Sequence, residues 1–215
     1  MKIGIVGGTG DIGEGMAMRL SQTHDVRLGS RDVTKAGEAS RECHLQVEGR
    51  GLPCAIDGSS NQEAADFGEM VILAIPFKHL IPTIESVSGL EGKVVVSPVN
   101  PMERREFFTY VPPAEGSAAQ LVQRLLPESK VVAAFNVIAA NRWKALDEPL
   151  DYAVPVCGDD QAAKRAVLDL VACVPRLQGY DAGPLGTACM VECITPLLLN
   201  VARYNKMRDV GIQFR

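Results

Sequence analysis

A glycine-rich turn near the N-terminus most constrains how this chain can fold. Gly8, Gly10 and Gly13 spell G-x-G-x-x-G. They follow an apolar run at residues 3–6 and precede a helical pattern at residues 13–22. In this context Gly8 permits a tight turn, Gly10 lets the backbone approach a pyrophosphate, and Gly13 lets the helix pack on the strand. Because free N–H groups at the helix start would face the phosphates, the sequence predicts a dinucleotide-binding turn; a ligand-free turn is the alternative.

The residues after the second predicted strand distinguish NADP from NAD. A unit that binds NAD usually has Asp or Glu here, which accepts hydrogen bonds from the ribose hydroxyls. This chain instead has Ser30 followed at once by Arg31, with Lys35 four residues later. Ser30 can donate to a 2′-phosphate, and the two cations can neutralise it. The pattern predicts NADP, with a solvated basic pair at a helix start as the alternative.

Strand and helix patterns alternate along most of the chain. This repetition predicts an α/β fold with a doubly wound parallel sheet of the Rossmann type, with six or seven strands. The continuous apolar run at residues 69–75 is typical of a parallel strand buried on both faces. The predicted strands are 3–6, 26–29, 55–56, 69–75, 93–97, 130–135 and 153–158, and the predicted helices are 13–22, 32–41, 61–65, 79–87, 117–125 and 161–174.

The pattern changes near residue 181. A turn at 181–186 precedes a long helical stretch at 188–204, which is apolar on several faces and contains Pro196 as an internal kink. We therefore divide the chain into a dinucleotide-binding domain, residues 1–180, and a small C-terminal helical part, residues 181–215. The irregular stretch at 100–117, rich in proline and charge, is expected to be a surface loop.

Composition argues against several classes of partner. The net charge of −4 gives no general attraction to nucleic acid or anionic membranes. We expect no membrane-spanning run and no signal peptide, since the chain enters its first strand directly. The six cysteines form no C-x-x-C pair, so we expect no metal site and a cytoplasmic protein with reduced thiols.

The carboxyl ends of the predicted strands contain few acids or bases that could catalyse a reaction. His79 lies one helical turn beyond a strand, where a surface or capping role is the ordinary one, and no Ser/His/Asp set is evident. Proline, aliphatic and amide side chains facing a nicotinamide suit direct hydride transfer between two flat rings. No catalytic residue is assigned with certainty. The segments concerned are 9–12, 30–31, 75–77, 97–101 and 136–140.

Motifs along the whole chain resemble those of the archaeal F420-dependent NADP oxidoreductases. They are GGTGDIG, LGSRD, VILAIPFKH, KVVVSPVNP, KVVAAFNVIAA, PVCGDD, DAGPLG and ITPLLLN. The resemblance implies a homodimer in which hydride passes between C5 of the deazaflavin of coenzyme F420 and C4 of the nicotinamide of NADP. The C-terminal part would complete the F420 pocket and the dimer contacts.

The resemblance also implies roles for individual residues. Asn136, Ile138 and Val210 match positions that line the deazaflavin, with Asn136 and Ile138 positioning the ring. A family member has Asn at the Asp11 position, and some have His at the Asn136 position, which leaves a proton-donating role for Asn136 in doubt. The residues expected to bind NADP are Gly8, Thr9, Gly10, Asp11, Ile12, Gly13, Ser30, Arg31, Lys35, Ile75, Pro76, Phe77 and Ala140.

Two other functions remain open from the sequence. One is an NADPH-dependent flavin, quinone or ferric reductase, since FNVIAA and VCGDD also resemble the NADPH-binding domains of STEAP-type membrane ferric reductases. The other is a protein that senses NADP without turnover, because the few acids and bases fit a sensor equally well. The apolar strand end at 136–140 and the C-terminal segment favour two stacked rings.

Overall fold

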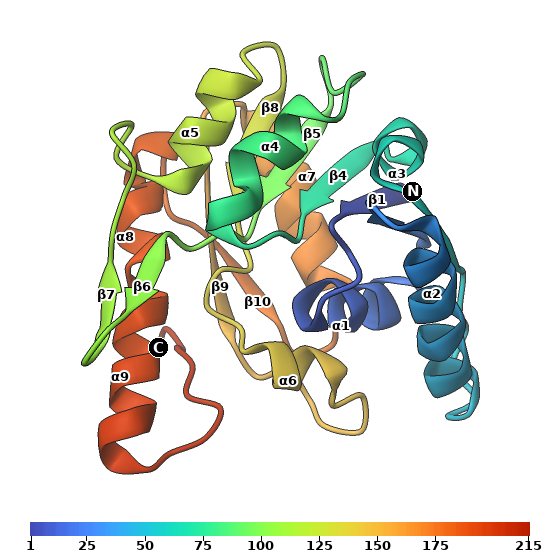
Figure 1. The fold of residues 1–215 in the computed structure, drawn as a ribbon. Helices are drawn as coiled ribbons and strands as arrows, with labels where there is room; N and C mark the ends of the chain where they lie inside the picture. The colour runs from blue at the N-terminus through green and yellow to red at the C-terminus, as the bar shows by residue number, and fades with distance from the viewer.

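The computed structural model describes residues 1–215, which form one eight-stranded sheet, a separate hairpin and flanking helices (Figure 1). The order in the large sheet is β10-β9-β8-β5-β4-β1-β2-β3, so strands are added on one side of β1 up to β3 and on its other side from β4 onward. The strands are β1 (Lys2–Val6), β2 (Asp25–Ser30), β3 (Ile56–Ser60), β4 (Met70–Leu73), β5 (Val94–Ser97), β6 (Met102–Arg104), β7 (Phe108–Tyr110), β8 (Lys130–Ala133), β9 (Ala153–Gly158) and β10 (Gln178–Asp181).

Helices follow most strands and cover the sheet. A Ser or Asp at the N-cap of α2, α3, α5 and α7 accepts a hydrogen bond from a backbone N–H of the first turn, which fixes where each helix begins. The helices are α1 (Asp11–Leu20), α2 (Val33–Glu48), α3 (Asn61–Phe67), α4 (Leu80–Glu85), α5 (Ala118–Leu125), α6 (Ala140–Lys144), α7 (Gln161–Ala172), α8 (Ala188–Glu192) and α9 (Ile194–Asn205), with single 3-10 turns η1 (Phe77–His79) and η2 (Leu185–Thr187).

The predicted doubly wound α/β fold is confirmed, with a correction to the far end of the sheet. Six strands, β3 to β8 across the sheet, run parallel. β9 pairs antiparallel to β8, and β10, which was not predicted, follows it parallel. The direction of β9 was missed because a fully buried apolar strand has the same pattern beside either kind of neighbour.

The stretch at residues 100–117 is not only a loop, as the sequence suggested. β6 and β7 pair antiparallel within it and form a hairpin beside α9 (Figure 1). Both strands have only three residues and β6 is exposed throughout, so the alternation of Phe108, Thr109 and Tyr110 in β7 is too short to predict a strand. A hairpin of this kind depends on the helix it packs against.

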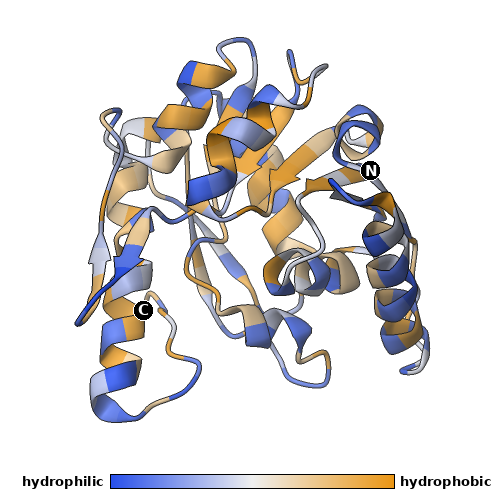
Figure 2. Cartoon of the chain, in the orientation of Figure 1, coloured by the Kyte–Doolittle hydropathy of each residue, from blue (hydrophilic) through white to orange (hydrophobic).

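The core lies on both faces of the central strands. β1 and β4 are buried along almost their entire lengths, and their side chains belong to one core cluster that also includes apolar side chains of α1, α4 and α5. Figure 2 shows that the central strands are hydrophobic. The register pairs Val6 of β1 with Leu73 of β4. The two strands therefore end side by side, and the turns that follow them face one another.

The C-terminal helices are bonded to the rest of the molecule through a buried carboxylate. Glu192 accepts hydrogen bonds from the backbone N–H groups of Ala118 and Ala119, at 2.8 and 3.0 Å, and from the hydroxyl of Tyr110 at 3.2 Å. Burial raises the pKa of Glu192 to about 7, although the three donors act in the opposite direction. One side chain thus joins α8 to the start of α5 and to β7.

The predicted helix at 188–204 forms as two pieces. The break falls at Cys193, three residues before Pro196, because Pro196 lacks an N–H and its ring crowds the carbonyl of the preceding turn. Residues 185–205 form a 21-residue run that contains an 18-residue window with a mean hydropathy of 1.6, which is long and apolar enough by these measures to cross a membrane, and 28% of that window is buried. The expectation of no such run was therefore wrong.

Candidate dinucleotide and substrate site

In the turn between β1 and α1, Gly8 and Gly13 are tightly packed, whereas Gly10 faces open space. A Cβ on Gly13 would meet the carbonyl of Gly8, and a Cβ on Gly8 would lie 2.5 Å from Leu28. A Cβ on Gly10, in contrast, would meet nothing within 4 Å. Gly8 and Gly13 are therefore required by packing, whereas the absence of a side chain at Gly10 leaves space for a ligand.

Asn61 supports this turn, although nothing in the sequence motif pointed to it. Its Oδ1 accepts a hydrogen bond from the N–H of Gly7 at 3.0 Å, and its side chain is buried. Gly7 has φ +70°, and a Cβ there would overlap the side chain of Ile75. The close contact with Ile75 brings the end of β4 against the turn.

A polar cavity of about 310 Å³ lies beside the turn. Arg31 and Lys35 line it, are exposed and form no ion pair, so both charges are free to meet an anion. Ser30 is buried, and its Oγ accepts from the N–H of Asp32 at 3.2 Å, which leaves its proton for a ligand. The lining residues are Gly7, Thr9, Gly10, Ser30, Arg31, Asp32, Lys35, Asn61, Ala74, Ile75, Pro76, His79 and Thr83.

A more apolar cavity of about 370 Å³ adjoins the first one, and the two share Gly10 and the stretch from Ala74 to Pro76. Its walls come from the ends of β1, β4 and β5 and from the start of α6. Such a hydrophobic space suits flat rings rather than phosphate. The lining residues are Gly10, Asp11, Ile12, Leu73, Ala74, Ile75, Pro76, Phe77, Pro98, Val99, Asn100, Met102 and Ala140.

The structure thus gathers most of the predicted NADP-binding residues around two joined cavities. Gly8 and Gly13 shape the turn without lining either cavity. Asn61, Thr83, Asn100 and Met102 line them and were not predicted. Met102 belongs to the unpredicted hairpin, Asn61 and Thr83 are ordinary polar residues that no motif marks, and Asn100 lies in the strand-end segment 97–101 without having been assigned a binding role.

Asn136 and Ile138, expected against the deazaflavin, are buried and line neither cavity. The Asn136 amide donates to the carbonyl of Val99 at 3.1 Å and to Asn100 Oδ1 at 3.3 Å, while Thr195 donates to its carbonyl at 2.7 Å. Asn136 therefore connects the ends of β5 and β8 to α9. Its Oδ1 is buried without a hydrogen-bond partner.

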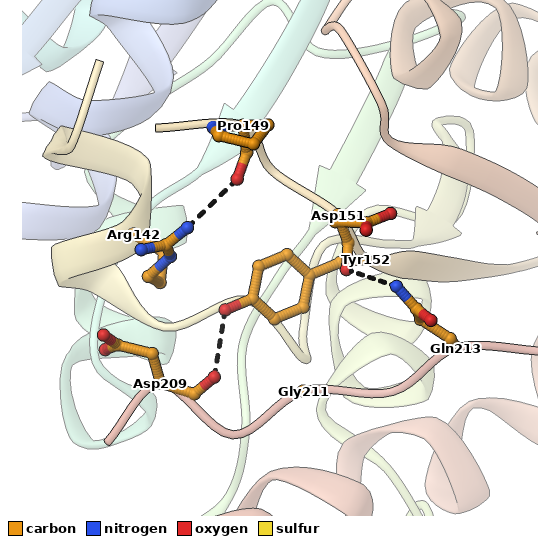
Figure 3. Close-up of a pocket in the computed structure, with 7 residues that line it drawn as sticks. All are labelled: Arg142, Pro149, Asp151, Tyr152, Asp209, Gly211 and Gln213. Atoms are coloured by element: carbon orange, nitrogen blue, oxygen red, sulfur yellow. Dashed lines mark hydrogen bonds between the residues drawn. The ribbon is translucent and has the colours of Figure 1, made fainter. Parts of the chain in front are cut away.

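Val210, the third residue expected at the deazaflavin, is half-buried in the C-terminal tail. The tail packs on Tyr152, whose hydroxyl donates to the carbonyl of Asp209 at 3.2 Å, and Asn141 donates to the Asp209 carboxylate. Figure 3 shows the polar cavity at this place, which Val210 does not line. Its residues are Arg142, Pro149, Asp151, Tyr152, Asp209, Gly211 and Gln213.

A buried arginine places α6 beside α1 (Figure 1). Arg19, on α1, donates to the carbonyls of Trp143, at 2.9 Å, and Ala145, at 2.5 Å. It also reaches the carbonyls of Arg142 and Glu148, both at 3.1 Å. Because these carbonyls lie at and beyond the end of α6, the guanidinium caps that helix and keeps its first residue, Ala140, at the apolar cavity.

The fold and the paired cavities define a Rossmann-type, dinucleotide-binding protein. Residues 2–101 match the family model described as "NADP oxidoreductase coenzyme F420-dependent". The chain is 38% identical over 221 residues to the F420-dependent NADP reductase of Methanocaldococcus jannaschii, covering 99% of this chain and 97% of that protein. The chain belongs to the F420-dependent NADP oxidoreductase family.

Two further comparisons show how widely the architecture extends. A crystal structure of a putative F420-dependent NADP reductase from an Arthrobacter species has the same fold, with a TM-score of 0.83, 24% identity and coverage of 100% of this chain and 99% of that one. Metalloreductase STEAP3 of Rattus norvegicus is 29% identical over 202 residues, which cover 92% of this chain but only 37% of that protein.

Gly10→Val should abolish dinucleotide binding and leave thermal stability almost unchanged. The new side chain would occupy the space in which nothing lies within 4 Å, so it would meet the ligand and not the protein. Calorimetric titration with NADP and a thermal melt check both halves of the expectation.

Gly13→Ala is the matched control, since its Cβ would meet the carbonyl of Gly8 and should lower the melting temperature. Normal NADP binding by Gly10→Val would show that the turn does not hold the phosphates.

Proposed function

We propose that this protein transfers a hydride directly between coenzyme F420 and NADP. The observation that carries the proposal is the junction of two unlike cavities at one glycine turn. One has unpaired cations beside Ser30, and the other has apolar walls. The first suits the 2′-phosphate and adenosine of NADP, and the second suits the nicotinamide with a second ring stacked on it. The names of the curated family members support the same pair of substrates.

The hydride chemistry itself belongs to the nicotinamide and the deazaflavin when both are bound. The residues of this chain bind and orient. The turn from Gly8 to Gly13 presents backbone N–H groups to the pyrophosphate, and Arg31 and Lys35 hold the 2′-phosphate. Ile75, Pro76 and Phe77 wall the ring space, exclude water and fix the ring, and Ala140 closes its far side. No side chain in the two cavities needs to move a proton.

For F420 we retain Asn136, Ile138 and Val210 as proposed ring-lining positions. Because the side chains of Asn136 and Ile138 are buried and line neither cavity, they act by shaping the wall behind the ring space. The division at residue 180 is also a proposal. The last strand of the sheet, β10, ends at Asp181, next to this division. The two parts remain in contact, since Ile212 in the tail accepts a hydrogen bond from Ala153 of β9.

Isotope transfer tests the reaction. With NADPH carrying deuterium at nicotinamide C4, prepared as each of the two epimers, one epimer should deliver its label to C5 of F420 without loss to water. Direct transfer between aligned rings requires this outcome, since no exchangeable proton lies on the path. Mass spectrometry of reduced F420 reports the label. Label appearing in water, or reduction of free flavin in place of F420, would favour the flavin-reductase alternative.

Arg31→Ala should weaken NADP binding by about one to two decades and leave NAD binding nearly unchanged, because a charge-assisted contact to phosphate is worth roughly 1.5–3 kcal/mol. Calorimetry with each nucleotide measures the difference. Arg41→Ala, which removes an exposed arginine of α2 that lines neither cavity, is the matched control and should change neither constant. Equal losses for NADP and NAD would contradict the assignment of the 2′-phosphate.

We also propose that the protein is a homodimer joined through α8 and α9, located in the cytoplasm, where its six free cysteines would remain reduced. The spacing of exposed and half-buried apolar side chains supports the dimer. Met190, Ile194, Leu197, Val201 and Tyr204 recur at alternating intervals of four and three, which is the seam of two packed helices. Met190, Leu197 and Tyr204 are 67, 60 and 66% exposed.

A second copy of the chain fits this seam better than a bilayer does. Asn200 exchanges hydrogen bonds with the backbone N–H and carbonyl of Phe108, at 2.9 and 2.7 Å, and Glu192 is held by α5. One side of the two helices is therefore bonded to protein through polar groups, and only one stripe is free. A helix surrounded by lipid would need an apolar surface on all sides.

Leu197→Glu should convert the dimer into monomers, because the new carboxylate would be buried without a partner in the middle of the seam. Light scattering after gel filtration measures the mass. The matched control is Leu45→Glu, which places the same charge at an equally exposed leucine of α2 and should not change the mass. A monomeric wild-type protein, or a dimeric Leu197→Glu variant, would overturn the proposed interface.

A further inference from the structure

Lys144 lies where α6 meets the glycine turn from Gly8 to Gly13, which is called the phosphate turn below. It is the last residue of α6, four residues after Ala140, and therefore on the same face as the residue that lines the apolar cavity. Its Nζ is 2.8 Å from Asp11 Oδ1 and 2.7 Å from Glu14 Oε2. Nothing in the sequence motifs marked this lysine, because its partners are more than a hundred residues away.

The partners of Lys144 are unusual for their place in the fold. Asp11 is the first residue of α1, between Gly10 and Gly13, and Glu14 follows in the same turn. Without a bound ligand, acidic side chains stabilise the start of a helix because they complement the helix dipole. The same carboxylates oppose a pyrophosphate that uses that helix start.

Lys144 keeps its charge at this position. Partial burial of the ammonium opposes protonation, but hydrogen bonds to Asp11 and Glu14 outweigh it and raise the pKa of Lys144 above its ordinary value. The three side chains together therefore carry one negative charge, where the two carboxylates alone would carry two.

Lys144 is not needed to hold α6 in place. Arg19 already bonds four carbonyls at and beyond the end of that helix. The ion pairs of Lys144 are partly exposed: 34% of its side chain, 75% of that of Asp11 and 22% of that of Glu14 are accessible to solvent. Partly exposed ion pairs contribute little to stability. Lys144 is therefore a candidate for a role in ligand binding.

We propose that Lys144 is a positioning residue for the pyrophosphate of NADP, which acts by neutralising Asp11 at the phosphate turn. The inference rests on the proposed NADP-binding function and adds a residue from a different segment of the chain. It also separates two groups of cations: Arg31 and Lys35, which face the 2′-phosphate without partners, and Lys144, which acts through a carboxylate. The first group recognises NADP alone, whereas Lys144 serves any dinucleotide.

A double-mutant cycle tests the proposal by calorimetry. Lys144→Met should weaken NADP and NAD about tenfold alike, because both carry the pyrophosphate that Asp11 would then repel. In the Asp11→Asn background the same substitution should cost less than about threefold, since the only charged partner left is Glu14, which lines neither cavity. Lys144→Arg should bind both nucleotides like the wild type. A thermal melt of each variant reports whether the fold has changed.

Adenosine 2′-monophosphate is the ligand control, because it contains the 2′-phosphate and no pyrophosphate. Its binding should be unaffected by Lys144→Met, whereas Arg31→Ala should weaken it. Equal weakening of this ligand and of NADP by Lys144→Met would mean that the lysine only supports the site structurally, and would overturn the inference. An equally large effect of Lys144→Met with Asn at position 11 would do the same.

NADP binding by the wild-type protein distinguishes failure of the proposed function from failure of the role of Lys144. If the wild-type protein binds no NADP, the proposed function fails and the role of Lys144 fails with it. If the wild type binds NADP and Lys144→Met binds it equally well, the inference about Lys144 is overturned and the proposed function stands.

Discussion

The contact between the backbones of Gly8 and Gly13 is the constraint on which the site depends. A Cβ on Gly13 would meet the Gly8 carbonyl, so α1 can lie back against β1 only with glycine there. This close approach aims the helix start at the ends of β1 and β4, where the sheet order reverses. Gly10 lies between these two glycines, and it faces open space because Gly8 and Gly13 on either side of it pack against the protein.

A second constraint joins the N-terminal half of the chain to the later one. The buried guanidinium of Arg19 gathers carbonyls from the end of α6 and from the loop beyond it, groups that would otherwise be left without donors. Because α1 carries both Arg19 and the phosphate turn, the position of α6 is tied to the position of the ligand. Ala140 and Lys144, one helical turn apart, therefore approach the site together.

How much could be predicted from the sequence depended on how local the physical cause was. The glycine turn and Ser30-Arg31-Lys35 lie within short segments whose chemistry is evident, and the structure places them around two joined cavities. The direction of β9 and the hairpin of β6 and β7 depend on neighbouring elements, and neither leaves a periodic pattern. The contacts of Arg19 with α6, and of Lys144 with Asp11, join residues more than a hundred positions apart and could be found only in the structure.

The arrangement of charge around the turn separates selectivity from affinity. Arg31 and Lys35 have no partner to release, so their full attraction is available to a group that NADP has and NAD lacks. Lys144 is already paired with Asp11 and Glu14. In the proposed role it therefore favours the ligand only by weakening the repulsion between these carboxylates and the pyrophosphate. In the proposed arrangement, a substitution in the first set changes the ratio of the NADP and NAD affinities, while one at Lys144 changes both affinities together. Two cationic elements with such different surroundings can be adjusted independently, which is how one turn can bind dinucleotides in general and still prefer one of them.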